Sequence, residues 1–548
     1  MMIRLLREGF QGFGLALSPR TQPFSRVVKP DDYHLSESKQ RSPNTRCPLL
    51  QSSFHYSNQA SHLPTMVVLD FFPILLTLFL GLGLAFVLSR LLTRKNPANL
   101  PKGTMGWPLC GETLALLKPH RSNSMGFFLQ QRCSRYGKIF KSHLFGYPAI
   151  VSCDYDFNMF ILQNEGKLFR ASYPTAMHDI LGKFSLLHIT GDLHKKLRNI
   201  AVSFITVSKS TPSFLHCVEK FSISMMESWK DRKEIGFHKD IRKFTLDLMV
   251  NTLMGIEPDE PVASKILKLF RTYMKGFVSL PLHFPGSPYS KAVKAREKLS
   301  STVREIIKEK EKEMNVEIAR KEDFLDVILS KRRLSDDETV SIVLDILLGG
   351  YETTSTLISL IVYFLAHSPV AFESLKKEHE VIRRSKEDGK PLDWEDYQKM
   401  EFTINVISES MRCGNVVKFV HRKALEDVKY KEYVIPSGWK VLPMFTGAHL
   451  DASLHENPFE FNPWRWSSDK TTSKKMMPFG GGARLCPGAE LAKVVIAFFL
   501  HHLVLNYRWK IKADEYPVAY PYVEFQRGLQ LEVEPAEQTI SKKEEAWN

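Results

Sequence analysis

Cysteine is scarce in this sequence and is never spaced as C-x-x-C. Only seven cysteines occur among 548 residues, and an odd number cannot all pair with one another. This pattern argues against a disulfide framework and against a structural zinc site. The sequence therefore fits a reducing environment that faces the cytosol.

Signatures of nucleic-acid binding are also missing from the sequence. It has no zinc-finger spacing and no aromatic signature of an RNA-binding domain. The formal net charge of +15 therefore suggests an anionic membrane surface or an acidic protein partner. No internal repeat is apparent, and a globular composition over 548 residues allows one large domain or two to four average ones.

The first 65 residues have little apolar periodicity and are rich in Ser, Pro, Arg and Gln, so we expect residues 1–65 to be a disordered leader. The excess of arginine over acidic residues is typical of an organelle transit peptide. The alternative is that the natural chain begins at Met66. We favour this alternative because the segment that follows is itself a complete targeting segment.

An apolar segment without charged residues spans residues 71–88. At about 1.5 Å per residue it can cross most of a hydrocarbon core. Basic residues follow directly, which places everything downstream in the cytosol. We expect residues 66–92 to be a transmembrane anchor rather than a secretory signal, because no small-residue cleavage site follows. Residues 93–108 then form a proline-rich hinge.

A capping box, Ser335-x-x-Glu338, begins a long apolar helix that ends at Ser368-Pro369. The segment Gly349-Gly-Tyr-Glu-Thr-Thr354 lies within it, although glycine and threonine are poor choices for a helix interior. A core helix weakened at one point indicates a function at that point. The alternative is a kinked core helix whose threonines bond back to its own carbonyls.

Short strands are also expected. Residues 139–144 and 149–152 predict a β-hairpin, and residues 426–443 predict a small sheet with a turn at Pro436-Ser-Gly438.

Residues 479–488 read Phe-Gly-Gly-Gly-Ala-Arg-Leu-Cys-Pro-Gly and precede a helix expected from Ala489 to Tyr507. A cysteine stays ionised near positive charge, backbone N–H donors or a helix N-terminus. We therefore interpret Cys486 as the thiolate ligand of an iron porphyrin. Arg484 can reach a porphyrin propionate, and Phe479 can shield the sulfur from water. The alternative is an ordinary buried cysteine in a glycine-rich loop.

This stretch resembles the haem-binding signature F-x-x-G-x-R-x-C-x-G of the cytochrome P-450 monooxygenases. The segment 349–354 likewise resembles the family motif A/G-G-x-D/E-T-T/S, which lies over the iron. The resemblance implies heme b as cofactor, with the iron bound by Cys486. It also implies that Thr353 and Glu352 are the catalytic residues and deliver protons.

Three further motifs are similar to those of the family. His194-Lys-Lys-Leu-Arg198 corresponds to Trp-x-x-x-Arg, whose two outer residues touch a haem propionate, with His here in place of Trp. Arg422 occupies a position that reaches a propionate in many relatives. Glu409-x-x-Arg412, together with Arg465 of the F-x-P-x-R-W pattern, implies a buried network that locks the loop carrying Cys486.

The resemblance implies a mainly α cytochrome P-450 fold with a small β-rich subregion over residues 109–535, preceded by one transmembrane helix and followed by a charged tail at 536–548. Only about forty residues follow the expected helix ending at Tyr507, and no flavin or iron–sulfur domain fits there. Electrons must therefore come from NADPH through a separate NADPH-cytochrome P-450 reductase, to which a basic protein can dock. We expect the enzyme at the endoplasmic reticulum membrane, with its catalytic domain in the cytosol.

Short stretches such as Gly414-Asn-Val-Val417 resemble the sequences of plant enzymes that oxidise steroids and triterpenoids. They are similar in particular to those of the brassinosteroid C-22 hydroxylases. This similarity implies hydroxylation of a campesterol-type side chain at C-22 with O2. One alternative is oxidation of a plant triterpenoid or diterpenoid such as a gibberellin or abscisic-acid type substrate. Others are an isomerase-type relative that uses no dioxygen and a haem carrier. The Glu352-Thr353 pair argues against the isomerase, and a haem carrier would not need Thr353.

Overall fold

The computed structural model describes residues 65–92, 99–107, 111–277, 279, 281–314, 323–331, 333–387, 389–468, 475–512, 514–520 and 522–536. The chain divides into two units, residues 1–81 and 82–548. Nearly all of the expected leader and of the charged tail lies outside the described residues, as does part of the expected hinge.

Helix α2 (Thr65–Leu92) covers the expected anchor and contains Pro73. The described side chains from 73 to 88 are exposed. Among the described residues, two other helices, Asp336–Ala366 and Ala489–Asn506, are long and apolar enough to cross a membrane, whereas α2 contributes the shorter apolar stretch Pro73–Phe86. Both of those helices are mostly buried in the folded body, so they are core helices. The membrane role of α2 stays a prediction.

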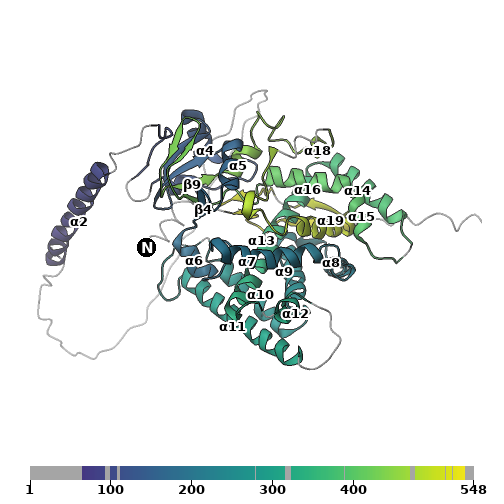
Figure 1. Ribbon diagram of the computed structural model, residues 1–548. Coiled ribbons are helices and arrows are strands. Elements are labelled where there is room, and N and C mark those ends of the chain that lie inside the picture. Colours follow the sequence, from purple (N-terminus) through teal and green to yellow (C-terminus); the bar gives the residue numbers. More distant parts are fainter. Residues whose placement is uncertain are drawn as a thin grey trace, which may run out of the picture. The chain divides into compact units, whose positions relative to one another are not determined.

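Helix α13 (Asp336–Ala366) runs through the middle of the second unit (Figure 1). Its start is the predicted capping box, in which Ser335 Oγ accepts from the Glu338 N–H and the Glu338 carboxylate accepts from the Ser335 N–H. It ends at Ala366, close to the predicted stop, and α14 (Pro369–Arg384) begins at the proline. The sequence therefore predicted this helix closely.

Two hydrophobic cores meet along α13. The first half of α13 packs with α7, α9, α10, α11 and α12, and the second half packs with α8, α9, α14, α16 and α19. Gly350 allows the close approach of α9, since a Cβ there would lie 2.6 Å from Sδ of Met249. Gly414 similarly allows the approach of α16, because a Cβ would lie 2.6 Å from Cδ1 of Leu360. Helix α13 is thus packed closely against α9 within its glycine–threonine segment, at Gly350, and against α16 after it, at Leu360.

The other helices complete these two groups and flank the sheets (Figure 1). They are α3 (Thr113–Leu116), α4 (Gly126–Tyr136), α5 (Tyr155–Gln163), α6 (Thr175–Leu181), α7 (Gly191–Ser208), α8 (Pro212–Glu227), α9 (Phe237–Met254), α10 (Pro261–Met274), α11 (Pro288–Met314), α12 (Phe324–Lys331), α15 (Trp394–Lys399), α16 (Glu401–Gly414), α17 (Phe445–His449), α18 (Arg465–Ser468), the 3₁₀ turn η2 (Gly482–Arg484) and α19 (Ala489–Asn506).

Across the described residues, the strands form four small sheets. The largest has the order β2 (Ile139–Leu144), β3 (Tyr147–Ser152), β9 (Lys440–Pro443), β6 (Arg422–Ala424) and β4 (Phe169–Ala171), and only β3 and β9 run parallel. The others are β1 (His120–Arg121) with β11 (Val518–Ala519) and β12 (Val523–Glu524), β10 (Tyr507–Ile511) with β13 (Gln530–Pro535) and β5 (Glu234–Gly236), and the hairpin β7 (Val428–Tyr430) with β8 (Tyr433–Ile435). The mainly α architecture with a small β-rich part agrees with the sequence prediction.

The predicted hairpin at 139–152 exists, but its turn is tighter than expected. Leu144 pairs with Tyr147, so Phe145 and Gly146 alone form the turn. Both have positive φ, 54° and 82°, as a type I′ turn requires. The Phe145 N–H donates to Thr113 Oγ1 over 2.7 Å, which holds this residue in its unusual conformation. That tertiary contact explains why the sequence suggested a longer loop.

Candidate active site

The loop that carries Cys486 is fixed by backbone contacts. Gly482 has φ +63°, and a Cβ there would lie 2.0 Å from the carbonyl oxygen of Leu162 in α5, so only glycine fits. The Cys486 N–H donates to the carbonyl oxygen of Phe479 over 3.0 Å. Helix α19 begins three residues later at Ala489. The cysteine therefore lies at a helix N-terminus, as predicted, and is only partly accessible.

The protein alone does not hold Cys486 ionised. Burial raises the pKa of the Cys486 thiol, and this effect outweighs the Gly488 N–H and the positive charge of Arg198, which lower it. The predicted positive charge and backbone N–H thus act on Cys486 in the expected direction, although burial has the larger effect on its pKa. A bound cation deprotonates a coordinating thiol outright, so ionisation belongs to the metal-bound state.

Several cations surround one carboxylate beside this loop. Glu165 accepts a hydrogen bond from Nε of Arg484 over 2.6 Å, and Nε of Arg422 lies 2.7 Å from its other oxygen, without hydrogen-bond geometry. Arg198 donates to the carbonyl oxygen of Leu485 over 2.5 Å. Two guanidinium groups thus share the Glu165 carboxylate, and that of Arg198 lies beside the same loop without a carboxylate partner among the described residues. This excess of positive charge fits the two propionates of heme b.

Arg484 has a further structural role that the sequence did not reveal. Its guanidinium also donates to the carbonyl oxygens of Leu186 over 2.9 Å and Ile189 over 2.5 Å. This side chain therefore ties the cysteine loop to the segment before α7. Its predicted contact with a propionate stays a prediction.

His194 is buried in the same cluster. Burial, together with the charges of Arg484 and Arg198, lowers its pKa to about 4. The imidazole is therefore neutral at pH 7 and can donate one hydrogen bond. The structure thus brings together all the residues that were predicted to hold the haem: His194, Arg198, Arg422, Phe479, Arg484 and Cys486.

Helix α13 is accessible at one point between its two buried halves. Gly349 and Thr353 are exposed there, whereas residues 354–362 are buried. A Cβ on Gly349 would meet nothing within 4 Å. The Thr353 hydroxyl donates back to the Gly349 carbonyl oxygen over 2.6 Å, as the alternative interpretation of this segment expected. The segment nevertheless faces open space, so Thr353 is available to a ligand.

Glu352 faces a partner that was not predicted. Its carboxylate forms an ion pair with Arg242 of α9, and Arg242 also lies 3.9 Å from Glu524 of β12. Burial raises the pKa of Glu352, although the charge of Arg242 opposes this. The carboxyl group is therefore half-buried and paired, and the positive charge of Arg242 lowers its pKa against the effect of burial.

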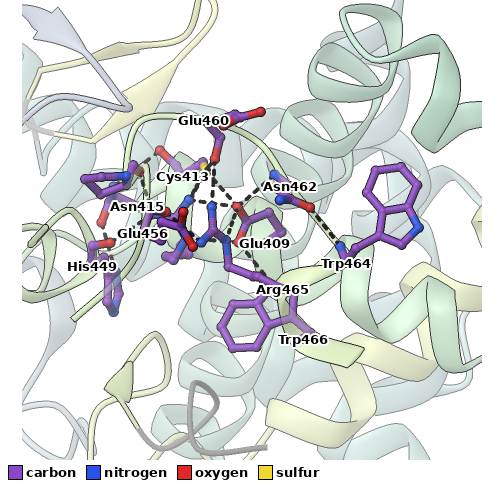
Figure 2. Close-up of polar contacts among 12 residues, drawn as sticks. Glu409, Cys413, Asn415, His449, Glu456, Glu460, Asn462, Trp464, Arg465 and Trp466 are labelled. Atoms are coloured by element: carbon purple, nitrogen blue, oxygen red, sulfur yellow. Dashed lines mark hydrogen bonds and ion pairs between the residues drawn. The ribbon is translucent and has the colours of Figure 1, made fainter. Parts of the chain in front are cut away.

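The predicted network around Glu409 is present in α16 and is shown in Figure 2. Arg412 binds both carboxylate oxygens of Glu409, over 2.9 and 2.7 Å, and both side chains are fully buried. Arg465 and the indole N–H of Trp466 each donate to the same carboxylate over 3.0 Å. Burial raises the pKa of Glu409, but the hydrogen bonds and charge of Arg412 reverse this and leave it lowered.

His449 connects this network to the cysteine loop. Its carbonyl oxygen accepts from Arg412 over 3.0 Å, and its Nε2 accepts from the Met477 N–H over 3.1 Å. Its Nδ1 lies 3.0 Å from Oδ1 of Asn415. This arrangement requires a neutral ring with the proton on Nδ1, in agreement with a pKa that burial lowers to about 3.

Glu165, Arg242 and His449 are the residues that the sequence analysis missed. Each lies 28 or more residues along the chain from the predicted site residue or loop residue that it contacts. None belongs to a motif, so no local pattern could have identified them.

The comparisons with known proteins agree with this geometry. The family profile described as Cytochrome P450 matches residues 101–523. The chain is 55% identical to "Cytochrome P450 724B1" of Oryza sativa subsp. japonica, over 84% of this chain and 97% of that protein. It is 43% identical to "Cholesterol 22-monohydroxylase CYP90B52" of Paris polyphylla, over 82% and 97%. Among solved structures, "Retinoic acid bound cyanobacterial CYP120A1" has a TM-score of 0.71 and 25% identity, covering 80% of this chain and all of that chain.

Proposed function

Because this chain belongs to the cytochrome P450 family, we propose that it hydroxylates C-22 of a campesterol-type side chain in brassinosteroid biosynthesis. It is a haem-thiolate monooxygenase of the steroid-hydroxylase kind. The observation that supports the substrate is that relatives 40–43% identical over at least 80% of this chain are named as cholesterol or steroid 22-hydroxylases.

The reaction consumes one C–H bond of the substrate, O2, NADPH and one proton, and yields the alcohol, water and NADP⁺. Iron bound through Cys486 supplies the oxygen-activating chemistry. Arg198, Arg422 and Arg484 supply the positive side chains for the propionates, and the neutral ring of His194 donates a hydrogen bond. The Glu409 network and His449 hold the loop at the position that the ligand sulfur requires.

Thr353 and Glu352 handle protons in this proposal. The Thr353 hydroxyl donates to the Gly349 carbonyl, and a threonine in a helix has two accessible χ1 rotamers. Rotation about the Cα–Cβ bond of Thr353 turns the hydroxyl towards the open space beside Gly349. Glu352, whose pKa burial raises, takes protons from solvent when it separates from Arg242, and passes them towards Thr353 through water.

The membrane and the electron donor complete the proposal. Helix α2 anchors the protein in the endoplasmic reticulum membrane through residues 66–92, with the haem domain in the cytosol. NADPH-cytochrome P450 reductase supplies the electrons. The net charge of +15 favours an acidic partner surface.

The direct test is reconstitution of the full chain with NADPH-cytochrome P450 reductase in microsomes. Campesterol and cholesterol are supplied in one series, and gibberellin-type and abscisic-acid-type substrates in another, with products identified by mass spectrometry. We expect 22-hydroxysterols only when both O2 and the reductase are present. Oxidation of the diterpenoid series without sterol turnover would refute the substrate, and product formation without O2 would refute the reaction.

A further inference from the structure

A partly enclosed cavity of about 170 Å³, with Lys418 and His120 in its wall, does not include the catalytic segment 349–354 among its lining residues. The segment 115–129, residues 418 and 419, and the β11–β12 hairpin surround it. Its walls are mostly apolar, including Leu116, Phe128, Met444 and Ala519. An apolar cavity of about 150 Å³ accommodates a benzene molecule. The cavity therefore has room for one six-membered ring.

Lys418 places a cation in this apolar wall. Its Nζ lies 2.8 Å from Nε2 of His120 and 3.4 Å from the carbonyl oxygen of Ser124. An ammonium group has three donors, so these contacts leave a third donor for a ligand. Among the described residues that line the cavity, none is acidic. The charge of Lys418 is therefore not neutralised by a carboxylate in the cavity wall.

The ring of His120 is held so that it supports the lysine. Its Nδ1 lies 2.8 Å from the carbonyl oxygen of Lys118, which fixes the proton on Nδ1 and leaves the lone pair of Nε2 for Lys418. Gly126 packs against the ring, since a Cβ there would lie 2.9 Å from Nδ1 of His120. Burial lowers the pKa of Lys418 to about 7, and burial followed by the charge of Lys418 lowers that of His120 to about 4. The histidine is thus a neutral acceptor.

The same hairpin connects this cavity to the catalytic segment. His120 pairs with Ala519 of β11, and β11 pairs with β12. Glu524 of β12 lies 3.9 Å from Arg242, the ion-pair partner of Glu352. The β11–β12 hairpin thus borders both the cavity that contains Lys418 and the Arg242–Glu352 ion pair.

We propose that Lys418, oriented by His120, binds an oxygen on the terminal ring of the substrate, at the end opposite to the carbon that is hydroxylated. This inference rests on the proposed function, because a sterol carries its hydroxyl on the ring farthest from its side chain. The apolar walls contact the ring, and the third donor of Lys418 bonds to the hydroxyl oxygen. The site therefore discriminates hydroxylated sterols from their deoxy analogues.

The test compares the dissociation constants of cholesterol and of its 3-deoxy analogue, measured at pH 6 from the ligand-induced Soret shift of the full-length holoenzyme, because Lys418, with a pKa of about 7, is mostly an ammonium group there. A hydrogen bond to a charged group corresponds to about a tenfold or larger preference for the hydroxylated ligand. We expect this preference in the wild type and its loss in Lys418→Met, with binding of the deoxy ligand retained. Lys118→Met is the matched control, since Lys118 is exposed beside the same cavity, and it should keep the preference.

The outcomes separate the two hypotheses. An unchanged preference in Lys418→Met overturns the Lys418 site and leaves the sterol substrate standing. A wild type that binds neither ligand overturns the sterol substrate and this inference with it. If Lys418→Met does not incorporate haem, Lys418→Gln replaces it, and here a preference as large as that of the wild type would overturn the site.

Discussion

The backbone N–H of Met477 donates a hydrogen bond to Nε2 of His449 over 3.1 Å. This bond joins the cysteine loop to the Glu409–Arg412 network, because the carbonyl oxygen of His449 accepts from Arg412. Met477 continues the connection, since its carbonyl oxygen accepts from the Gly480 N–H over 3.0 Å. The position of Cys486 thus depends on a histidine outside every motif.

We expect His449→Leu to weaken haem retention. The substitution leaves the buried Met477 N–H and Asn415 amide oxygen without this partner, at about 1–3 kcal/mol for each unpaired group. Haem transfer to apomyoglobin measures the rate of loss, and thermal unfolding measures stability. The control is His216→Leu, at an exposed histidine of α8. Equal haem-loss rates in the two variants would contradict the connecting role of His449.

Replacement of the ligand sulfur gives the most direct test of the site. Cys486→Ser should lose the long-wavelength Soret band of the reduced carbon monoxide complex. A metal ligand of this kind must be deprotonated, and the serine hydroxyl loses its proton far less readily than the cysteine thiol. Cys217→Ser is the matched control, since Cys217 donates to Asn251 in a buried contact that serine can also make. A retained band in Cys486→Ser would show that another side chain binds the iron.

Local patterns predicted the elements and the motif residues, but not the partners of these residues. The capping box predicted the start of α13, and the Cys486 stretch predicted the loop before α19. The ion pair of Glu352 with Arg242 spans 110 positions of the chain, and that of Glu165 with Arg484 spans 319. Such contacts depend on how whole elements pack, and the turn at Phe145 was misjudged for the same reason.

Thr353→Ala separates a chemical role of the hydroxyl from a structural one. Within the described residues, the hydroxyl bonds to its own helix at Gly349. Such a contact slightly destabilises helices, and alanine is the better helix former. We therefore expect unchanged or slightly higher thermal stability, together with a larger share of NADPH consumption that yields hydrogen peroxide. The buried neighbour Thr354 provides the control, and Thr354→Ala should keep the coupling ratio. An unchanged ratio in Thr353→Ala would contradict its part in proton delivery.

The Arg242–Glu352 ion pair predicts a pH-dependent change in stability. Burial raises the pKa of Glu352 and the charge of Arg242 opposes this, so Arg242→Met should raise that pKa further. A carboxyl group whose pKa is higher in the folded than in the unfolded protein binds more protons when folded, and stability falls as pH rises between the two pKa values. The destabilisation of Arg242→Met relative to the wild type should therefore be small near pH 5 and larger at pH 8. Denaturant unfolding at both pH values measures it.

The double variant Arg242→Met/Glu352→Gln removes the titrating group together with its partner. Its stability relative to the wild type should depend less on pH than that of Arg242→Met, because an amide neither titrates nor carries a charge that burial penalises. If the loss of stability relative to the wild type is the same at pH 5 as at pH 8, in Arg242→Met as well as in the double variant, Arg242 acts by packing rather than by charge. Control of the protonation of Glu352 by α9 would then be refuted, and Glu352 would have to exchange protons independently of that helix.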